Sequence, residues 1–158
     1  MEQFYVGVKI VRGKPMARGK FDAMIGNDPP NHDVYILDGY AVTYPGGYVS
    51  WSPKNVFESA YLSMETNEPS ELNDSRVTAK MVDEFMGSIN TTQIDNKTTM
   101  VSVETPTGFV IHETSSCVDP DNFDLAVGGE VCANKISDKL WAFLGFVVQW
   151  GKYGLKSG

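Results

Sequence analysis

The sequence lacks three things: a surplus of basic residues, a long apolar run, and the ligand clusters of a metal site. Its 158 residues carry 13 Lys and Arg against 20 Asp and Glu, a net charge of −7. Nonspecific nucleic-acid binders need clustered Lys and Arg facing phosphates, so a nucleic-acid polymer is not an expected partner. No run reaches the ~18 apolar residues of a membrane span, and no signal-peptide block opens the chain. We therefore expect a cytoplasmic protein with no membrane partner.

Cysteine and histidine are scarce, which limits the chemistry available. The two cysteines, Cys117 and Cys132, fit free thiols in a reducing compartment, and neither His32 nor His112 has a second ligand at metal spacing. His112 and Cys117 are five residues apart, and side chains at that spacing on a strand face opposite sides. Motifs for phosphate loops, nucleophile elbows or dinucleotides are absent from the sequence. We expect no metal, no cofactor and no enzymatic activity.

Charge divides the chain into three stretches. Residues 1–63 hold six basic and six acidic side chains, residues 64–74 hold four acids and no base, and residues 75–158 hold seven bases and ten acids. The middle stretch has little to bury and repels itself, which is typical of a solvated linker. The sequence predicts two small modules, 1–63 and 75–158, joined by the acidic linker 64–74.

Turn and helix signals predict an α+β fold built from small antiparallel sheets with packed helices. In the first module we expect an edge strand over 4–11, a helix from Lys14 to about Ile25, a hairpin over 39–51, and a helix from the Ser52-Pro53 cap to Tyr61.

The second module is predicted to contain two helices and a three-stranded meander. Thr78 is expected to cap the first helix, with apolar residues recurring at helical spacing as far as Ile89. Three strands follow over 91–94, 99–104 and 109–113, and a long helix is expected from Asp121 to Leu144, ended by Gly145.

Two segments could hold a ligand. The candidate residues of the first module place aromatic rings beside hydroxyls and cations, a set that suits a nucleobase and its phosphate: Arg18, Tyr48, Trp51, Ser52 and Lys54. The alternative role for Trp51 is to fill the core of a small module.

In the second module, Ser115, Ser116 and Asn122 precede the expected helix start, where free amides and the helix dipole can hold an anion. Alternatively, Asp119 is simply the cap of that helix, with Pro120 at its first position.

Asn134 is the last candidate, and it belongs to a polar stripe on the long helix that also contains Glu130 and Ser137. Polar groups within an apolar arc need partners from a ligand, another subunit or the sheet, and an edge of the buried face explains the stripe equally well. The wide apolar arc favours a homo-oligomer, most simply a dimer built partly on this helix.

The second module resembles the small tailed-phage family typified by the gene-49 and gene-66 products of enterobacterial phages. The similarity covers about residues 75–150 and is carried by Ser115–Asp124, which contains Cys-Val-Asp-Pro-Asp-Asn-Phe-Asp, by Arg76–Thr78, and by Lys139–Phe146. Gly129-Glu130 stand where this family usually carries basic residues, which argues against an anion contact from that helix turn.

The first module is similar to a phage accessory module, through Lys9–Val11, Lys14–Gly19, Gly47–Lys54 and Phe57–Tyr61. That module also precedes domains similar to phage sponges, which sequester nucleotide signals of bacterial defence. The resemblance implies a non-enzymatic counter-defence protein that binds a cyclic nucleotide or an ADP-ribose derivative. A protein–protein inhibitor that covers a basic host factor with its acidic surface is the alternative.

Overall fold

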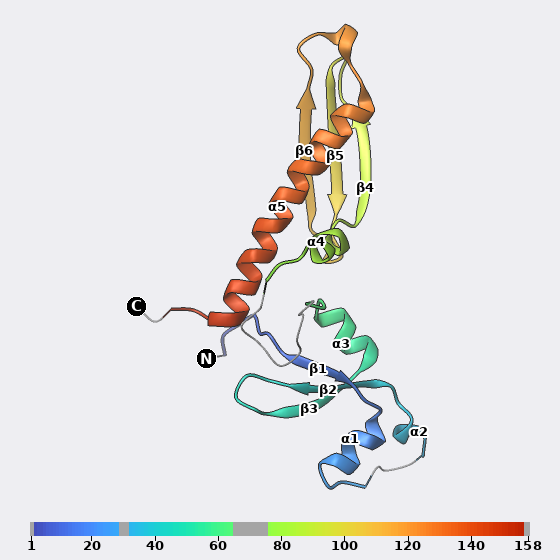
Figure 1. Ribbon diagram of the computed structural model, residues 1–158, viewed down its shortest axis with the longest axis vertical. Coiled ribbons are helices and arrows are strands. Elements are labelled where there is room, and N and C mark those ends of the chain that lie inside the picture. Colours follow the sequence, from blue (N-terminus) through green and yellow to red (C-terminus); the bar gives the residue numbers. More distant parts are fainter. Residues whose placement is uncertain (1, 29–31, 65–75, 157–158) are drawn as a thin grey trace. The chain divides into compact units, whose positions relative to one another are not determined.

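The computed structural model describes residues 2–28, 32–64 and 76–156, which form two compact units (Figure 1). The first unit comprises Met1–Ser63 together with Gln149–Gly158, and the second comprises Met64–Val148. The end of the chain therefore groups with the first unit, whereas the sequence assigned all of 75–158 to one module. Of the predicted acidic linker 64–74, residues 65–74 lie outside the described residues.

The first unit is a three-stranded antiparallel sheet with short helices. Its strands follow the order β1-β2-β3. In chain order its elements are β1 (Arg12–Pro15), α1 (Arg18–Met24), α2 (His32–Tyr35), β2 (Gly39–Thr43), β3 (Val49–Pro53) and α3 (Lys54–Ala60). The predicted hairpin is confirmed, and its turn contains Gly46 and Gly47 at positive φ, a conformation that glycine adopts without strain.

Three local predictions for this unit are wrong. The helix expected from Lys14 begins only at Arg18, because Lys14 and Pro15 pair with β2 as part of β1. Residues 4–11 form no strand, because β2 already ends at Thr43, opposite Arg12, and leaves earlier residues without a partner. Ser52 does not cap α3, because the ladder between β2 and β3 continues past it to Pro53 and the helix begins only at Lys54.

The second unit is a three-stranded meander with one long helix across it. Its strands follow the order β4-β5-β6. Its elements are α4 (Ala79–Phe85), β4 (Ser88–Gln93), β5 (Thr98–Glu104), β6 (Val110–Ser116), the 3-10 helix η2 (Pro120–Asn122) and α5 (Leu125–Tyr153), the last of which ends within the first unit. Together the two small antiparallel sheets and their helices confirm the predicted α+β class.

The start of this unit follows its sequence signals closely. Thr78 caps α4 through its side-chain oxygen, which accepts a hydrogen bond from the backbone N–H of Met81 at 3.3 Å, as predicted. Ile89, however, lies on β4. The helix ends at Phe85, and Gly87 follows it at a point where a Cβ would lie only 2.1 Å from the carbonyl oxygen of Glu104.

The long helix exists as predicted, but both of its predicted ends are wrong. Asp119 caps only η2, whereas the Asp124 carboxylate accepts hydrogen bonds from the N–H groups of Ala126 and Val127 and caps α5. Gly145 lies inside the helix, which continues to Tyr153 and is followed by Gly154 at positive φ. Among the described residues, no helix combines the length and apolarity needed to cross a membrane.

One face of the second sheet is buried under α5, which lies across the strands in Figure 1. The buried side chains of α5 recur every four residues and pack over alternate residues of β5. They are Cys132, Ile136, Leu140 and Leu144 on the helix, and Thr99, Val101 and Val103 on the strand. Each fully buried aliphatic side chain contributes about 1.5–3 kcal/mol, so this layer stabilises the unit.

The helix approaches the sheet most closely at Gly128. A Cβ at this position would lie 2.3 Å from Oγ1 and 2.8 Å from Cβ of Thr99. Thr99 is buried, and its hydroxyl has no hydrogen-bond partner in the described part of the chain. Because Cβ of threonine cannot rotate away, only glycine fits here without moving the helix.

We therefore predict that Gly128→Ala lowers the free energy of unfolding by about 1–2 kcal/mol, since overpacking outweighs the gain in helix propensity. Gly145→Ala is the matched control in the same helix, because a Cβ there meets nothing within 4 Å. That change should raise stability by about 0.5–1 kcal/mol. Urea denaturation followed by circular dichroism measures both, and equal effects of the two substitutions would contradict the proposed close approach.

Candidate ligand site

Trp51 is the fixed centre of the candidate site in the first unit. Its indole N–H donates a hydrogen bond to the carbonyl oxygen of Met16 at 2.8 Å. A Cβ on Gly39 would lie 2.4 Å from Cζ2 of the indole, so the ring packs directly on the strand backbone. The ring is only partly buried. The sequence offered a core role and a ligand role as alternatives, and the partial burial is compatible with both.

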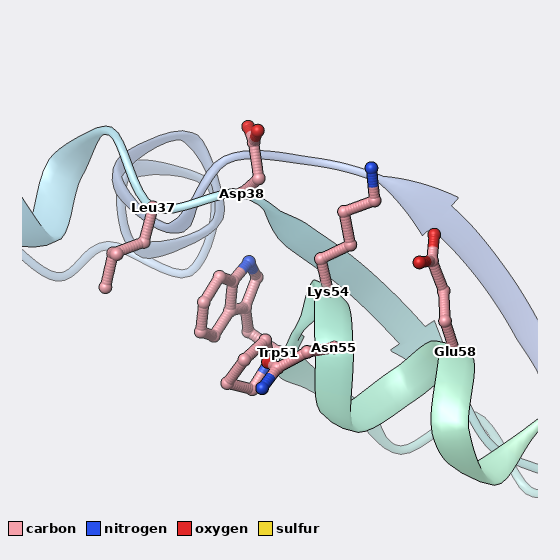
Figure 2. Close-up of a pocket in the computed structure, with 7 residues that line it drawn as sticks. Leu37, Asp38, Trp51, Lys54, Asn55 and Glu58 are labelled. Carbon is pink, nitrogen blue, oxygen red and sulfur yellow. The ribbon is translucent and has the colours of Figure 1, made fainter.

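The ring lines a pocket of about 390 Å³ at the point where β3 passes into α3. Figure 2 shows its wall, which combines apolar, amide and charged groups. The lining residues are Leu37, Asp38, Trp51, Pro53, Lys54, Asn55 and Glu58. In this view Asp38, Lys54 and Glu58 extend in the same direction, away from the indole. The pocket therefore presents a flat apolar surface beside three charged groups.

Lys54 is the cation of this pocket. Its backbone N–H donates a hydrogen bond to the carbonyl oxygen of Asp38 at 3.1 Å. This bond fixes the start of α3 beside the segment that precedes β2. Its ammonium has no carboxylate within ion-pair distance among the residues that the structure describes. The ligand-binding role predicted for Lys54 stays a prediction.

Arg18 lies close to Trp51 but is already engaged. Its guanidinium carbon lies 5.3 Å from the centre of the indole ring, in a cation–π arrangement. Its Nε donates to both carboxylate oxygens of Asp22, at 2.8 and 2.9 Å, and Asp22 is only 2% exposed. Arg18 thus neutralises a buried acid and supports the indole, which makes it a positioning residue.

Tyr48 and Ser52, the other candidates of this unit, do not line the pocket. Tyr48 is 70% exposed in the hairpin, and its ring lies 5.7 Å from that of Tyr44. Ser52 is next to Trp51 on β3, and successive side chains of a strand point to opposite faces. Of the five candidates, Trp51 and Lys54 therefore line the pocket, and Arg18 contacts Trp51 without lining it.

The carboxylate of Glu58 joins the pocket to an aromatic stack on α3. It accepts a hydrogen bond from the Tyr40 hydroxyl at 2.8 Å, and the Tyr40 ring stacks on Phe57 with centroids 4.3 Å apart. This hydrogen bond to a carboxylate raises the pKa of Tyr40 above its ordinary value. At neutral pH the hydroxyl therefore stays protonated and holds Glu58 at the rim.

Sequence reasoning missed five lining residues: Leu37, Asp38, Pro53, Asn55 and Glu58. The spacing of Lys54 and Glu58, four residues apart on a predicted helix, is a signal that they share one face. Leu37 and Asp38 come from the segment before β2, and nothing in the local pattern places them beside α3.

The candidates of the second unit occupy separate positions. Ser115 and Ser116 belong to β6, not to a loop before a helix, because the ladder continues to the pair formed by Ser116 and Thr98. The hydroxyls of Thr98 and Ser116 lie 2.8 Å apart. Asn122 lies in η2, and the first free amides of α5 are taken by Asp124. The expected anion site at a helix start at Asp121 is therefore not formed.

Asn134 is an exposed residue of α5. Of the polar stripe to which it was assigned, Glu130 is also exposed and Ser137 is half-buried, so the stripe runs along the edge of the buried face.

The side chains of Cys117 and His112 contact different groups. The Cys117 thiol donates to the carbonyl oxygen of Asp119 at 3.1 Å. His112 Nδ1 lies 2.8 Å from the hydroxyl of Ser102. The described residues also contain no group of three or more His, Cys, Asp or Glu side chains that could hold a metal ion.

Comparison with known proteins links the second unit to a phage family. The model of the family described as "Phage protein (N4 Gp49/phage Sf6 gene 66) family" matches residues 72–151. Neither the curated proteins nor the solved structures contain a match.

The engagement of Arg18 gives a prediction about stability. Arg18→Gln removes the cation next to buried Asp22 and should lower the free energy of unfolding by on the order of 2 kcal/mol, a value reduced from that of a fully buried pair because Arg18 is partly exposed.

The double variant Arg18→Gln/Asp22→Asn should recover part of this loss, and Arg12→Gln on exposed β1 is the control. Urea denaturation, followed through the Trp51 indole signal by NMR, measures all three. An unchanged midpoint in Arg18→Gln would show that the pair contributes nothing.

Proposed function

The chain belongs to the phage protein (N4 Gp49/phage Sf6 gene 66) family, and on this basis we propose that it is a phage accessory protein that binds and sequesters a nucleotide signal of host immunity. We place this activity in the host cytoplasm and assign no catalytic step to the chain. The observation that carries the proposal is the pocket lined by both the fixed Trp51 indole and Lys54, whose ammonium has no ion-pair partner among the described residues.

The chemistry of the pocket matches the parts of a nucleotide. The indole offers a flat apolar surface for a base, and contacts of this kind contribute about 1–3 kcal/mol per base. Lys54 can bind a phosphate as a point charge. Asp38 and Glu58 can accept hydrogen bonds from an exocyclic amine or from ribose hydroxyls.

The charge balance narrows the ligand class. One ammonium and two carboxylates line the pocket, so its net charge is negative and a triphosphate would be repelled. A cyclic nucleotide or an ADP-ribose derivative carries fewer negative charges for each base and ribose than a nucleoside triphosphate does. The resemblance of the first unit to a module found in front of nucleotide sponges supports the same class.

A second function is favoured by the same two carboxylates. Asp38 and Glu58, on a chain of net charge −7, also suit a basic side chain of a host protein. In this alternative the protein is an inhibitor that covers a basic surface of a host factor.

Purification from infected or expressing cells separates the two functions. A nucleotide released on denaturation of the purified protein, seen by its ultraviolet absorbance, supports sequestration. A stoichiometric host protein that copurifies supports inhibition. A thermal-shift panel of cyclic dinucleotides, cyclic trinucleotides and cyclic ADP-ribose isomers identifies the ligand, because a ligand at 100 times its Kd adds about 2.7 kcal/mol to stability.

We predict that Lys54→Met weakens nucleotide binding by about tenfold or more, because it removes the charge-assisted contact to phosphate. Lys20→Met, at an exposed position of α1 that does not line the pocket, is the control and should leave the affinity unchanged. Glu58→Gln keeps an acceptor oxygen in the pocket and should weaken nucleotide binding less than Lys54→Met does, whereas it should strongly weaken the binding of a basic protein partner. Isothermal calorimetry measures these effects, and wild-type affinity in Lys54→Met would refute the nucleotide pocket.

A further inference from the structure

The two edges of the second unit's sheet are not equally protected. Edge strands expose unpaired N–H and C=O groups, and proteins normally block them with charges, proline, bulges or covering elements. At the β6 edge, Lys135 of α5 donates to the carbonyl oxygen of Thr114 at 2.9 Å, and Lys139 forms an ion pair with Glu113. This edge is therefore covered by side chains of the helix.

The β4 edge has none of these protections within its strand. Its sequence, Ser-Ile-Asn-Thr-Thr-Gln over Ser88–Gln93, contains no charge, no proline and no glycine, and all six residues are exposed. Residues of an antiparallel strand alternate between bonding the neighbour and pointing away from it. Ile94 donates to Thr98 of β5, which sets the phase of this alternation. By this phase Ile89, Thr91 and Gln93 direct both backbone groups away from β5.

We propose that β4 is the site at which a second copy of this chain pairs, antiparallel and about a twofold axis at Thr91. In this register Thr91 lies opposite Thr91 of the second copy, and Ile89 lies opposite Gln93. These residues share one face of the sheet, so the pleat of the two strands matches. The three outward residues of each copy meet one another, and the two sheets become one sheet of six strands.

The features of β4 favour a second copy over a different partner. Two chains of net charge −7 repel each other, and an uncharged strand brings them together where no charge has to be desolvated. An isologous contact requires a surface that complements itself, and the face-matched register provides this. Pairing also covers Ile89, which is 52% exposed although it lies on the same face of the sheet as α5.

The position of α5 agrees with this interface. A Cβ on Gly129 would lie 3.3 Å from Cγ2 of Thr91, so the helix begins close to β4. Pairing at β4 therefore places the first turns of the two α5 helices on the same face of the joined sheet, one on each side of the line where the two β4 strands meet. The interface would include the long helix, on which the sequence predicted an oligomer.

The test is the mass of the full chain in solution at tens of micromolar, measured by light scattering. The expected value is twice the 17.4 kDa of one chain. Thr91→Pro removes one outward N–H from each copy without removing a bond to β5, and should raise the dimer Kd by about tenfold or more. Thr114→Pro is the matched control, since it makes the same change in the middle of the other edge strand, and it should remain dimeric.

Hydrogen exchange of the wild-type protein provides a measurement that does not depend on variants. The amides of Ile89, Thr91 and Gln93 should exchange more slowly as concentration drives dimer formation, while the amide of Thr114 should not change. A mass of 17.4 kDa, a folded Thr91→Pro that stays dimeric, or protection at Thr114 instead of Thr91 would each overturn the proposal.

Discussion

The second unit depends on the packing of one helix against one strand. Its sheet has three strands, and only the face that meets α5 is buried, with Thr99, Val101 and Val103 of β5 beneath the helix. This packing requires the close approach at Gly128, because any larger residue would lift the first turns of the helix from Thr99. One helix cannot cover both faces and both edges of this sheet. The lysines of α5 protect β6, whereas β4 has no charge or proline within its strand, which is why we propose it as the pairing edge.

The first unit also has a small core, and aromatic rings fill it. Phe57 stacks on Tyr40 at 4.3 Å and on Tyr61 at 4.8 Å, and its ring fills the space over Gly13. Trp51 is held from three sides by Met16, Gly39 and Arg18. Because these rings fill the space that aliphatic side chains fill in a larger domain, the same indole can support the fold and line a pocket.

Local signals were reliable in the sequence where a single interaction decides the structure. The hairpin follows from Gly46 and Gly47, and the start of α4 follows from the Thr78 cap. The predictions failed where the outcome depends on a distant partner. Residues 4–11 alternate like a strand, but β2 is too short to pair with them. Gly145 does not end α5, because helix ends depend on packing as well as on residue type.

The candidate site shows the same division and limits what its ligand can be. Trp51 and Lys54 could be predicted because they are close in sequence, whereas Asp38 reaches the pocket only through the fold. Without Asp38 and Glu58 the sequence describes a site for phosphates, and with them the pocket has more negative than positive charge. Under the proposed function, donors of the ligand would have to satisfy these carboxylates while Lys54 binds its phosphate. For the proposed nucleotide ligand, the base and the ribose would supply uncharged N–H and O–H donors to the carboxylates, whereas inorganic phosphate and pyrophosphate would add negative charge beside them.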